Sequence, residues 1–219
     1  MRFLRPTPQR IAVLVAATIG VGAGAAYAAS LSVGSWHLWA GSQALTKATC
    51  TLGASATTDT YVAQGSPGTS FGTNTTMLVR SNASSQDWSF IRFDLSSCNI
   101  PATGGADSAT LTLTVTSAPG NSRTITVTPV LSTWSNTLTW TGAQSLSYGA
   151  ATTTFATGTT TGTKTATVTV DVDNLIKSST ANFGWRLSDG GSGNQTTTFG
   201  TSQNGTAANR PQLVINYEK

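Results

Sequence analysis

Residues 106–118 read ADSATLTLTVTSA, and apolar and hydroxyl-bearing side chains alternate along most of this stretch. Leu111, Leu113 and Val115 fall on one parity, and threonines occupy the positions between them. Successive side chains of an extended chain point to opposite faces of a sheet. The pattern therefore predicts a long β-strand with one apolar face and one polar face.

Similar alternating runs lie on both sides of this stretch, separated by turns rich in Gly, Pro, Asn and Ser. Short alternating runs with such turns are typical of antiparallel sandwiches. We therefore expect an all-β protein that forms a single antiparallel β-sandwich. The expected strands are residues 59–65, 76–81, 87–96, 106–118, 123–131, 164–172, 183–189, 196–202 and 211–218. Residues 172–179 would form at most a single turn or short helix capped by Asp173.

The stretch DWSFIRFDLSSCNI, residues 87–100, has two unlike faces. One parity is apolar, whereas the other combines aromatic rings with a guanidinium and a carboxylate: Trp88, Phe90, Arg92 and Asp94. This second face is either a binding surface or a second buried layer. In a buried layer Arg92 would pair with Asp94 or Asp59, and loops or the N-terminal segment with Trp36 and Trp39 would cover the face.

The N-terminus resembles a secretory signal. A basic start, MRFLRPTPQR, precedes the apolar run IAVLVAATIGVGAGA and the small residues AYAAS. This pattern predicts a signal peptide over residues 1–28 and a secreted or cell-surface protein. The alternative is an uncleaved membrane anchor, since residues 11–29 approach the length that spans a bilayer. We expect a linker or extra strand over residues 29–56 and the sandwich domain over residues 57–219.

The charge of the mature chain argues against a nucleic-acid partner. The chain has 12 Lys and Arg and 8 Asp and Glu residues, for a formal charge of +4. Arg2, Arg5 and Arg10 lie in the leader, which leaves nine basic against eight acidic residues, a net charge of +1. The remaining basic residues are scattered, and nucleic-acid binding needs a basic stripe or patch.

Two cysteines, Cys50 and Cys98, make up the whole cysteine content. An even number in a secreted chain predicts a disulfide, which would join the segment before the domain to the end of the 87–96 strand.

Motifs for catalysis are scarce. The single histidine is His37, and no Gly-x-Ser-x-Gly elbow or zinc-ligand spacing occurs in the sequence. We therefore expect no enzymatic activity and no cofactor. One weak metal candidate remains, because Asp171 and Asp173 share a parity of an expected strand and carboxylate oxygens bind Ca²⁺. Otherwise the pair would be a solvated strand end.

Several motifs together are similar to those of one known family. DTYVAQGSPGTSFGTNTTMLVRS and SFIRFDLSS are followed by ATLTLTVT, VLSTWSNTLTW, VDVDNLI, FGWRLSD and RPQLVINY, between residues 59 and 217. In this order they resemble the DNRLRE-type domain, or carbohydrate-binding module family 96. The resemblance implies a β-sandwich of jelly-roll type that binds polysaccharide, in some members an acidic one such as alginate. Asn136 and residues 202–204 depart from the family pattern by lacking charge.

Two functions follow from these observations. The first is a secreted, non-catalytic carbohydrate-binding module, with acidic polysaccharide as a candidate ligand. Arginines would bind glycan carboxylates, aromatic rings would stack on sugars, and polar side chains would fix hydroxyls. If strands 76–81 and 87–96 pair, Arg80 and Arg92 would lie on the same face of the sheet. The candidate residues are Arg80, Arg92, Trp88, Phe90, Asp59, Tyr61 and Asn74. The alternative is an extracellular structural, cell-surface or matrix protein without a soluble ligand.

Overall fold

The computed structural model describes residues 46–82, 84–101, 104–177 and 181–219 with their side chains. For residues 29–33 and 36–40 it describes the backbone alone. The chain divides into two compact units, Met1–Ala44 and Leu45–Lys219. In the first unit, β1 (Ala29–Val33) and β2 (Trp36–Ala40) form an antiparallel pair. The predicted leader, residues 1–28, and the side chains of Trp36, His37 and Trp39 lie outside the described part.

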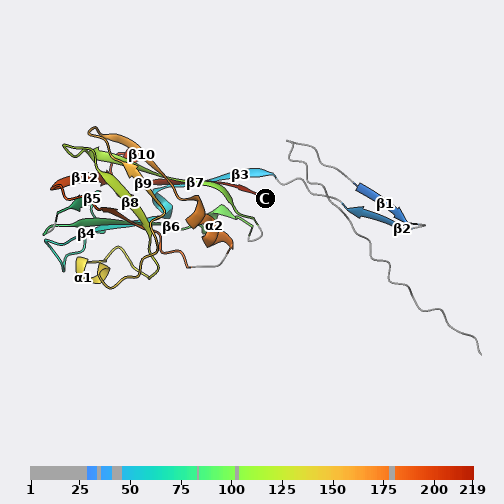
Figure 1. The fold of residues 1–219 in the computed structure, drawn as a ribbon, viewed down its shortest axis with the longest axis horizontal. Coiled ribbons are helices and arrows are strands. Elements are labelled where there is room, and N and C mark those ends of the chain that lie inside the picture. The colour runs from blue at the N-terminus through green and yellow to red at the C-terminus, as the bar shows by residue number, and fades with distance from the viewer. Residues whose placement is uncertain (1–28, 34–35, 41–45, 83, 102–103, 178–180) are drawn as a thin grey trace, which may run out of the picture. The chain divides into compact units, whose positions relative to one another are not determined.

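The second unit is a single all-β domain with one curled sheet of 11 strands (Figure 1). Its strands are β3 (Lys47–Leu52), β4 (Thr57–Ala63), β5 (Thr76–Ser81), β6 (Asp87–Phe93), β7 (Ala106–Ser117), β8 (Thr124–Pro129), β9 (Thr153–Ala156), β10 (Gly162–Thr167), β11 (Trp185–Asp189), β12 (Gln195–Gly200) and β13 (Gln212–Glu218). Two helices, α1 (Trp140–Ala143) and α2 (Thr169–Lys177), and short 3₁₀ turns at Ala54–Ala56, Ser96–Cys98 and Ala207–Asn209 complete the domain.

The strands pair in the order β3-β13-β7-β12-β5-β6-β11-β8-β9, with β10 added to β7 and β4 added to β6. All ladders between these strands are antiparallel. Between β5 and β6 the only paired residues are Arg80 and Asp87. This single pair separates one layer, which runs from β3 to β5, from a second layer of β4, β6, β11, β8 and β9. The expected antiparallel sandwich is thereby confirmed.

The main core lies between the two layers. Side chains of the first layer, such as Leu113 of β7 and Ile215 of β13, share one buried cluster with Ile91 of β6 and Leu187 of β11. The apolar parity of each predicted strand supplies this cluster, because period-2 alternation places every second side chain on one face. Strand β3 also pairs with β13 and buries Leu52. The domain therefore begins earlier than the expected boundary at residue 57.

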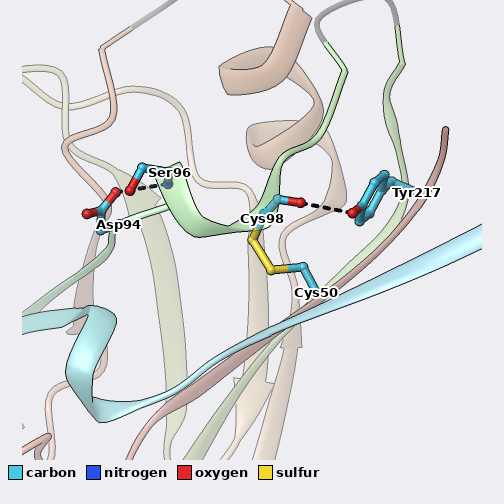
Figure 2. Close-up of a disulfide and its surroundings, with 5 residues drawn as sticks. All are labelled: Cys50, Asp94, Ser96, Cys98 and Tyr217. Carbon is cyan, nitrogen blue, oxygen red and sulfur yellow. Dashed lines mark hydrogen bonds between the residues drawn. A yellow bond between two sulfur atoms is a disulfide. The ribbon is translucent and has the colours of Figure 1, made fainter.

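The disulfide between Cys50 and Cys98 is present, as the cysteine count predicted. Figure 2 shows that it joins β3 to the 3₁₀ turn after β6. The Tyr217 hydroxyl donates to the Cys98 carbonyl at 2.9 Å, so β13 is tied to the same point. Asp94 accepts a hydrogen bond from the Ser96 backbone N–H at 2.9 Å, and this bond stabilises the beginning of the 3₁₀ turn. The disulfide and the Tyr217 hydrogen bond therefore attach β3 and β13, the first and last strands of the domain, to the same turn.

The expected strand over residues 164–172 is wrong in its second half. Strand β10 ends at Thr167, and α2 begins at Thr169. Val168 and Val172 are buried, whereas the side chain of Val170 between them is 66% exposed. A spacing of four residues fits one face of a helix as well as one face of a strand, and packing against β7 selects the helix. Asp173 is therefore inside a helix and does not cap one.

Among the described residues, no helix combines the length and the apolar character that crossing a membrane requires.

Candidate functional site

Trp88, Phe90 and Arg92 do share one face of β6, as their parity predicted. They are opposite Val62, Thr60 and Thr58 of β4, and this face points away from the main core. On the other edge of β6, Phe90 is opposite Arg186 of β11. We call this surface of β4, β6, β11 and β8 the outer face.

Residues 130–149, which we call the cover segment, lie over much of the outer face. Val62 and Phe90 of the sheet form a second buried cluster with Val130, Trp134 and Ala143 of the cover segment. Phe90 is fully buried, and its ring centroid lies 5.6 Å from that of Trp134. Half-buried rings and side chains surround this cluster: Trp88, Leu138, Trp140, Leu146, Tyr148 and Phe183.

Hydrogen bonds fix the cover segment at several points. The Trp134 indole N–H donates to the Phe183 carbonyl at 2.6 Å, and the Thr141 backbone N–H donates to the Pro67 carbonyl at 3.1 Å. The Tyr148 hydroxyl donates to the carbonyl of Ala143 at 2.6 Å. Helix α1, which belongs to the cover segment, lies beside β4 (Figure 1). Phe90 and Trp134 are thus core residues, in agreement with the buried-layer alternative.

The side chain of Arg186 lies at the edge of the cover segment and is half-buried there. Its guanidinium carbon lies 4.6 Å from the Trp88 ring centroid and 4.1 Å from the Tyr148 ring centroid. Trp140 stands 4.6 Å from Trp88 and extends the aromatic surface. These four residues form what we call the Arg186 site. Gly184, with φ +69°, precedes the strand; an added Cβ there would collide with the Ile91 carbonyl, so glycine allows β11 to approach β6.

The Arg186 site carries a positive charge that no carboxylate of the described residues balances through an ion pair. The buried Nε of Arg186 also has no hydrogen-bond partner within the described residues. Burial lowers the pKa of Arg186, and the Tyr148 hydroxyl is the polar neighbour that partly offsets this. Neither the cover segment nor the outer positions of β4, β6, β8 and β11 contain an acidic residue. The surface is therefore aromatic and positively charged.

Arg92 lies at another edge of the outer face. Its guanidinium carbon is 5.6 Å from the Trp134 ring centroid. It lines a polar hollow of about 430 Å³ together with Thr57, Thr58 and Asp94. The pKa of Asp94 is lowered mainly by hydrogen bonds from Ser96 and to a smaller extent by Arg92. Of the two pairings considered for Arg92 in a buried layer, that with Asp59 does not occur, because Asp59 points to the opposite face of β4, and the described residues show no ion pair between Arg92 and Asp94 either.

Arg80 does not share the outer face with Arg92, so the expectation that the two arginines lie together is wrong. Arg80 is opposite Asp87, which has the parity of the main core, and its Nε lies 3.0 Å from an Asp87 carboxylate oxygen. Burial raises the pKa of Asp87, and the Arg80 guanidinium lowers it by less. The arginines diverge because the chain turns from one layer to the other between β5 and β6.

The three polar candidates gather at the loop after β12, away from the outer face. Asp59 is 1% exposed and accepts hydrogen bonds from the backbone N–H and hydroxyl of Ser202 at 2.6 and 3.2 Å. Tyr61 is buried and stacks on Phe71 at 4.2 Å. Asn74 is exposed, and its side chain partly offsets the rise in the pKa of Tyr61 that burial causes. Asp59 and Tyr61 thus hold the loops in place and present little surface to a ligand.

Asp171 and Asp173 lie on α2, not on the strand that suggested a calcium pair. The Asp171 carboxylate accepts from the Trp185 indole N–H at 2.6 Å and from the Thr152 hydroxyl at 2.5 Å. Asp173 accepts from Lys177 at 2.9 Å and from the Ala106 backbone N–H at 3.1 Å. The two carboxylates have separate partners, and the described residues contain no group of three or more His, Cys, Asp or Glu that would hold a metal ion.

Comparison with known proteins defines the class of the domain. A model of carbohydrate-binding module family 96 matches residues 51–217, which include nearly the whole sandwich. The chain belongs to carbohydrate-binding module family 96. The resemblance seen in the sequence is thereby confirmed, and this family 96 module is a member of a class of binding domains. No curated protein matches the chain.

The sequence of the family 96 module did not lead us to single out Arg186, the cation of the Arg186 site. Arg186 occurs in FGWRLSD, where it has the opposite parity to Trp185 and Leu187. The same parity argument that selected Arg92 would have placed Arg186 on the outer face. No sequence pattern pointed to Tyr148, because apolar and polar side chains do not alternate in the loop before it. Its approach to Arg186 depends on how the cover segment folds back on the sheet.

Proposed function

We propose that this module binds an acidic polysaccharide outside the cell, with the Arg186 site as its binding surface. The observation that carries the proposal is the half-buried guanidinium of Arg186, which lies beside two aromatic rings and has no carboxylate partner among the described residues. A cation in such a place is stable without an internal anion because the ring faces attract it. Its outer N–H groups remain available to an external acceptor.

The chemistry of this surface suits a chain of uronic acids. A guanidinium binds a carboxylate through a planar fork of N–H donors, which adds direction as well as charge. The half-buried rings of Trp88, Trp140 and Tyr148 would pack against the apolar face of a sugar ring. Arg92 adds a second positive charge at another edge of the same sheet face, next to Asp94, and the outer positions within β4, β6, β8 and β11 hold no carboxylate that would repel the ligand.

Secretion is part of this proposal, because a polysaccharide of this kind is an extracellular ligand and residues 1–28 have the pattern of a signal peptide. The disulfide supports the same location, since disulfides persist in oxidising compartments. The module would act without catalysis, by holding its own chain or a partner on the glycan.

Affinity electrophoresis tests the proposal. The protein would run through gels that contain alginate, de-esterified pectin, fully methyl-esterified pectin or hydroxyethylcellulose. We expect retardation by the first two alone. Arg186→Gln should weaken this binding by about tenfold or more, because a charge-assisted hydrogen bond contributes about 1.5–3 kcal/mol. Arg186→Lys, which keeps the charge but not the fork, should lie between the two.

Lys47→Gln is the matched control. It also removes one positive charge, from a side chain that is 81% exposed and belongs to the opposite layer. Its retardation should equal that of the unaltered protein. Equal retardation by esterified and de-esterified pectin would show that carboxylates are not recognised. No retardation in any gel would favour the alternative function, an extracellular structural protein whose outer face serves only as packing.

A further inference from the structure

We propose that a cleft between α2 and the start of the cover segment is a second binding site, which takes one neutral pyranose ring. The cleft has a volume of about 240 Å³. This is smaller than most sites for drug-sized ligands and suits a single ring. Its walls come from Val130 and Leu131, from Leu175 of α2, and from Phe183 and Trp185 at the start of β11.

Most of these walls are apolar, and one of them is unusually exposed. Leu131 is 57% exposed, and it is one of only two large apolar side chains in the described residues that face solvent to this extent. The Leu131 backbone N–H donates to the Ser147 carbonyl at 2.8 Å, which fixes this residue at the edge of the cleft. An exposed leucine beside an apolar cleft offers a surface for the C–H face of a sugar ring.

Asp171 gives the cleft its charge, and Asn174 of α2 is a further polar side chain on its wall. Among the described residues that line the cleft, Asp171 is the one with a charged side chain. Both of its hydrogen bonds, from the Trp185 indole N–H and the Thr152 hydroxyl, end on the same carboxylate oxygen, Oδ2. These two donors orient the carboxylate rigidly. A carboxylate accepts hydrogen bonds from hydroxyl groups, and this one would fix the ring that packs on Leu131.

The charge of Asp171 selects the kind of sugar. A uronic acid would bring a second carboxylate next to the first, which is unfavourable in a half-buried place. A cationic amino sugar would have to give up the hydration of its ammonium group in a mostly apolar cleft, and this cost can exceed the attraction of one carboxylate. The class of ligand is therefore a neutral, hydroxylated pyranose, either free or as one residue of a larger glycan.

This cleft is separate from the Arg186 site and does not depend on it. Trp185 and Arg186 are neighbours on β11, so their side chains point to opposite faces of the strand. One site is aromatic and positively charged, and the other is apolar with one negative charge. The two sites would thus accept different residues of a mixed polysaccharide.

Titration of the full chain by NMR tests the inference. The probes are methyl β-glucopyranoside, glucuronate and glucosamine, which are neutral, anionic and cationic. The indole N–H signal of Trp185 reports on the cleft, because it is bonded to Asp171. We expect saturable shifts with the neutral sugar and a dissociation constant on the order of 1 mM, as the ligand efficiency of a small molecule suggests. The charged probes should bind at least about tenfold more weakly.

Two substitutions and two controls locate the site. Leu131→Ser should weaken binding of the neutral sugar by about tenfold, and its exposure ensures that the domain still folds. Asp171→Asn should weaken it similarly. Val170→Ser is the matched control, since Val170 is also exposed, at 66%, but does not line the cleft. Arg186→Gln should leave sugar binding unchanged and alter only retardation by acidic polysaccharide.

Several results would overturn the inference. These are no saturable shift with the neutral sugar, tighter binding of either charged probe, or unchanged binding by folded Leu131→Ser protein. If Asp171→Asn does not fold, the Leu131 variant still decides. A failure of this kind would leave retardation by alginate intact, so it is distinguishable from a failure of the proposed function.

Discussion

Replacement of Phe90 by alanine distinguishes a buried outer face from an open one. Phe90 is fully buried between the sheet and the cover segment. An aromatic side chain buries about 150–250 Å². At roughly 25 cal/mol per Å² its burial stabilises the fold by about 4–6 kcal/mol. Alanine retains part of this, so we expect Phe90→Ala to lower the free energy of unfolding by about 3–5 kcal/mol.

Urea-induced unfolding, followed by circular dichroism with the disulfide intact, measures this loss. Leu131→Ala is the control, because Leu131 is also a large apolar residue but is 57% exposed. Surface substitutions usually change stability by less than about 0.5 kcal/mol. The slope of free energy against urea should stay the same in both variants, which makes their midpoints comparable.

A loss for Phe90→Ala as small as that for Leu131→Ala would refute the reasoning. It would mean that the cover segment does not pack on the sheet in solution, and that Phe90 is instead accessible to ligand. The geometry of the Arg186 site would then fail as well, because Tyr148 belongs to the cover segment.

Two further predictions concern the disulfide and a buried carboxylate. The double replacement Cys50→Ala and Cys98→Ala removes a crosslink with a sequence separation of 48. The chain-entropy relation then predicts that the free energy of unfolding, measured in urea, falls by about 4 kcal/mol. A fall of less than about 1 kcal/mol would contradict this prediction. Burial raises the pKa of Asp59 above 3.8, so the stability that its protonated form contributes is lost as pH rises through the folded pKa. The unfolding free energy of the unaltered protein should therefore fall relative to that of Asp59→Asn as the pH rises above about 4, and parallel pH profiles would exclude this.

The sequence alone was informative wherever a property depends on neighbours along the chain. Strand β5 was predicted at residues 76–81 and β7 at residues 106–118, and both formed within one residue of these limits. Period-2 alternation is a local signal, and it also placed Trp88, Phe90 and Arg92 on one face of β6. The cysteine count predicted the disulfide for a similar reason, since only two cysteines were available to pair.

Local patterns misled where one spacing fits two structures. Val168 and Val172 fit both a strand and a helix, and only their packing against β7 selected α2 and left Val170 exposed. The alternating pattern also gave no warning that β5 and β6 meet at a single residue pair. Because of this pairing, Arg80 lies beside Asp87 and away from Arg92.

The tertiary structure alone decided whether the outer face of β6 is open or covered. Its cover comes from residues 130–149, about 40 residues or more along the chain from Phe90, and nothing in the alternation of β6 records this contact. The Arg186 site combines residues 88, 140, 148 and 186 in the same way. The sequence determined which face each side chain takes because that depends on backbone geometry, whereas long-range packing determined which of these side chains meet.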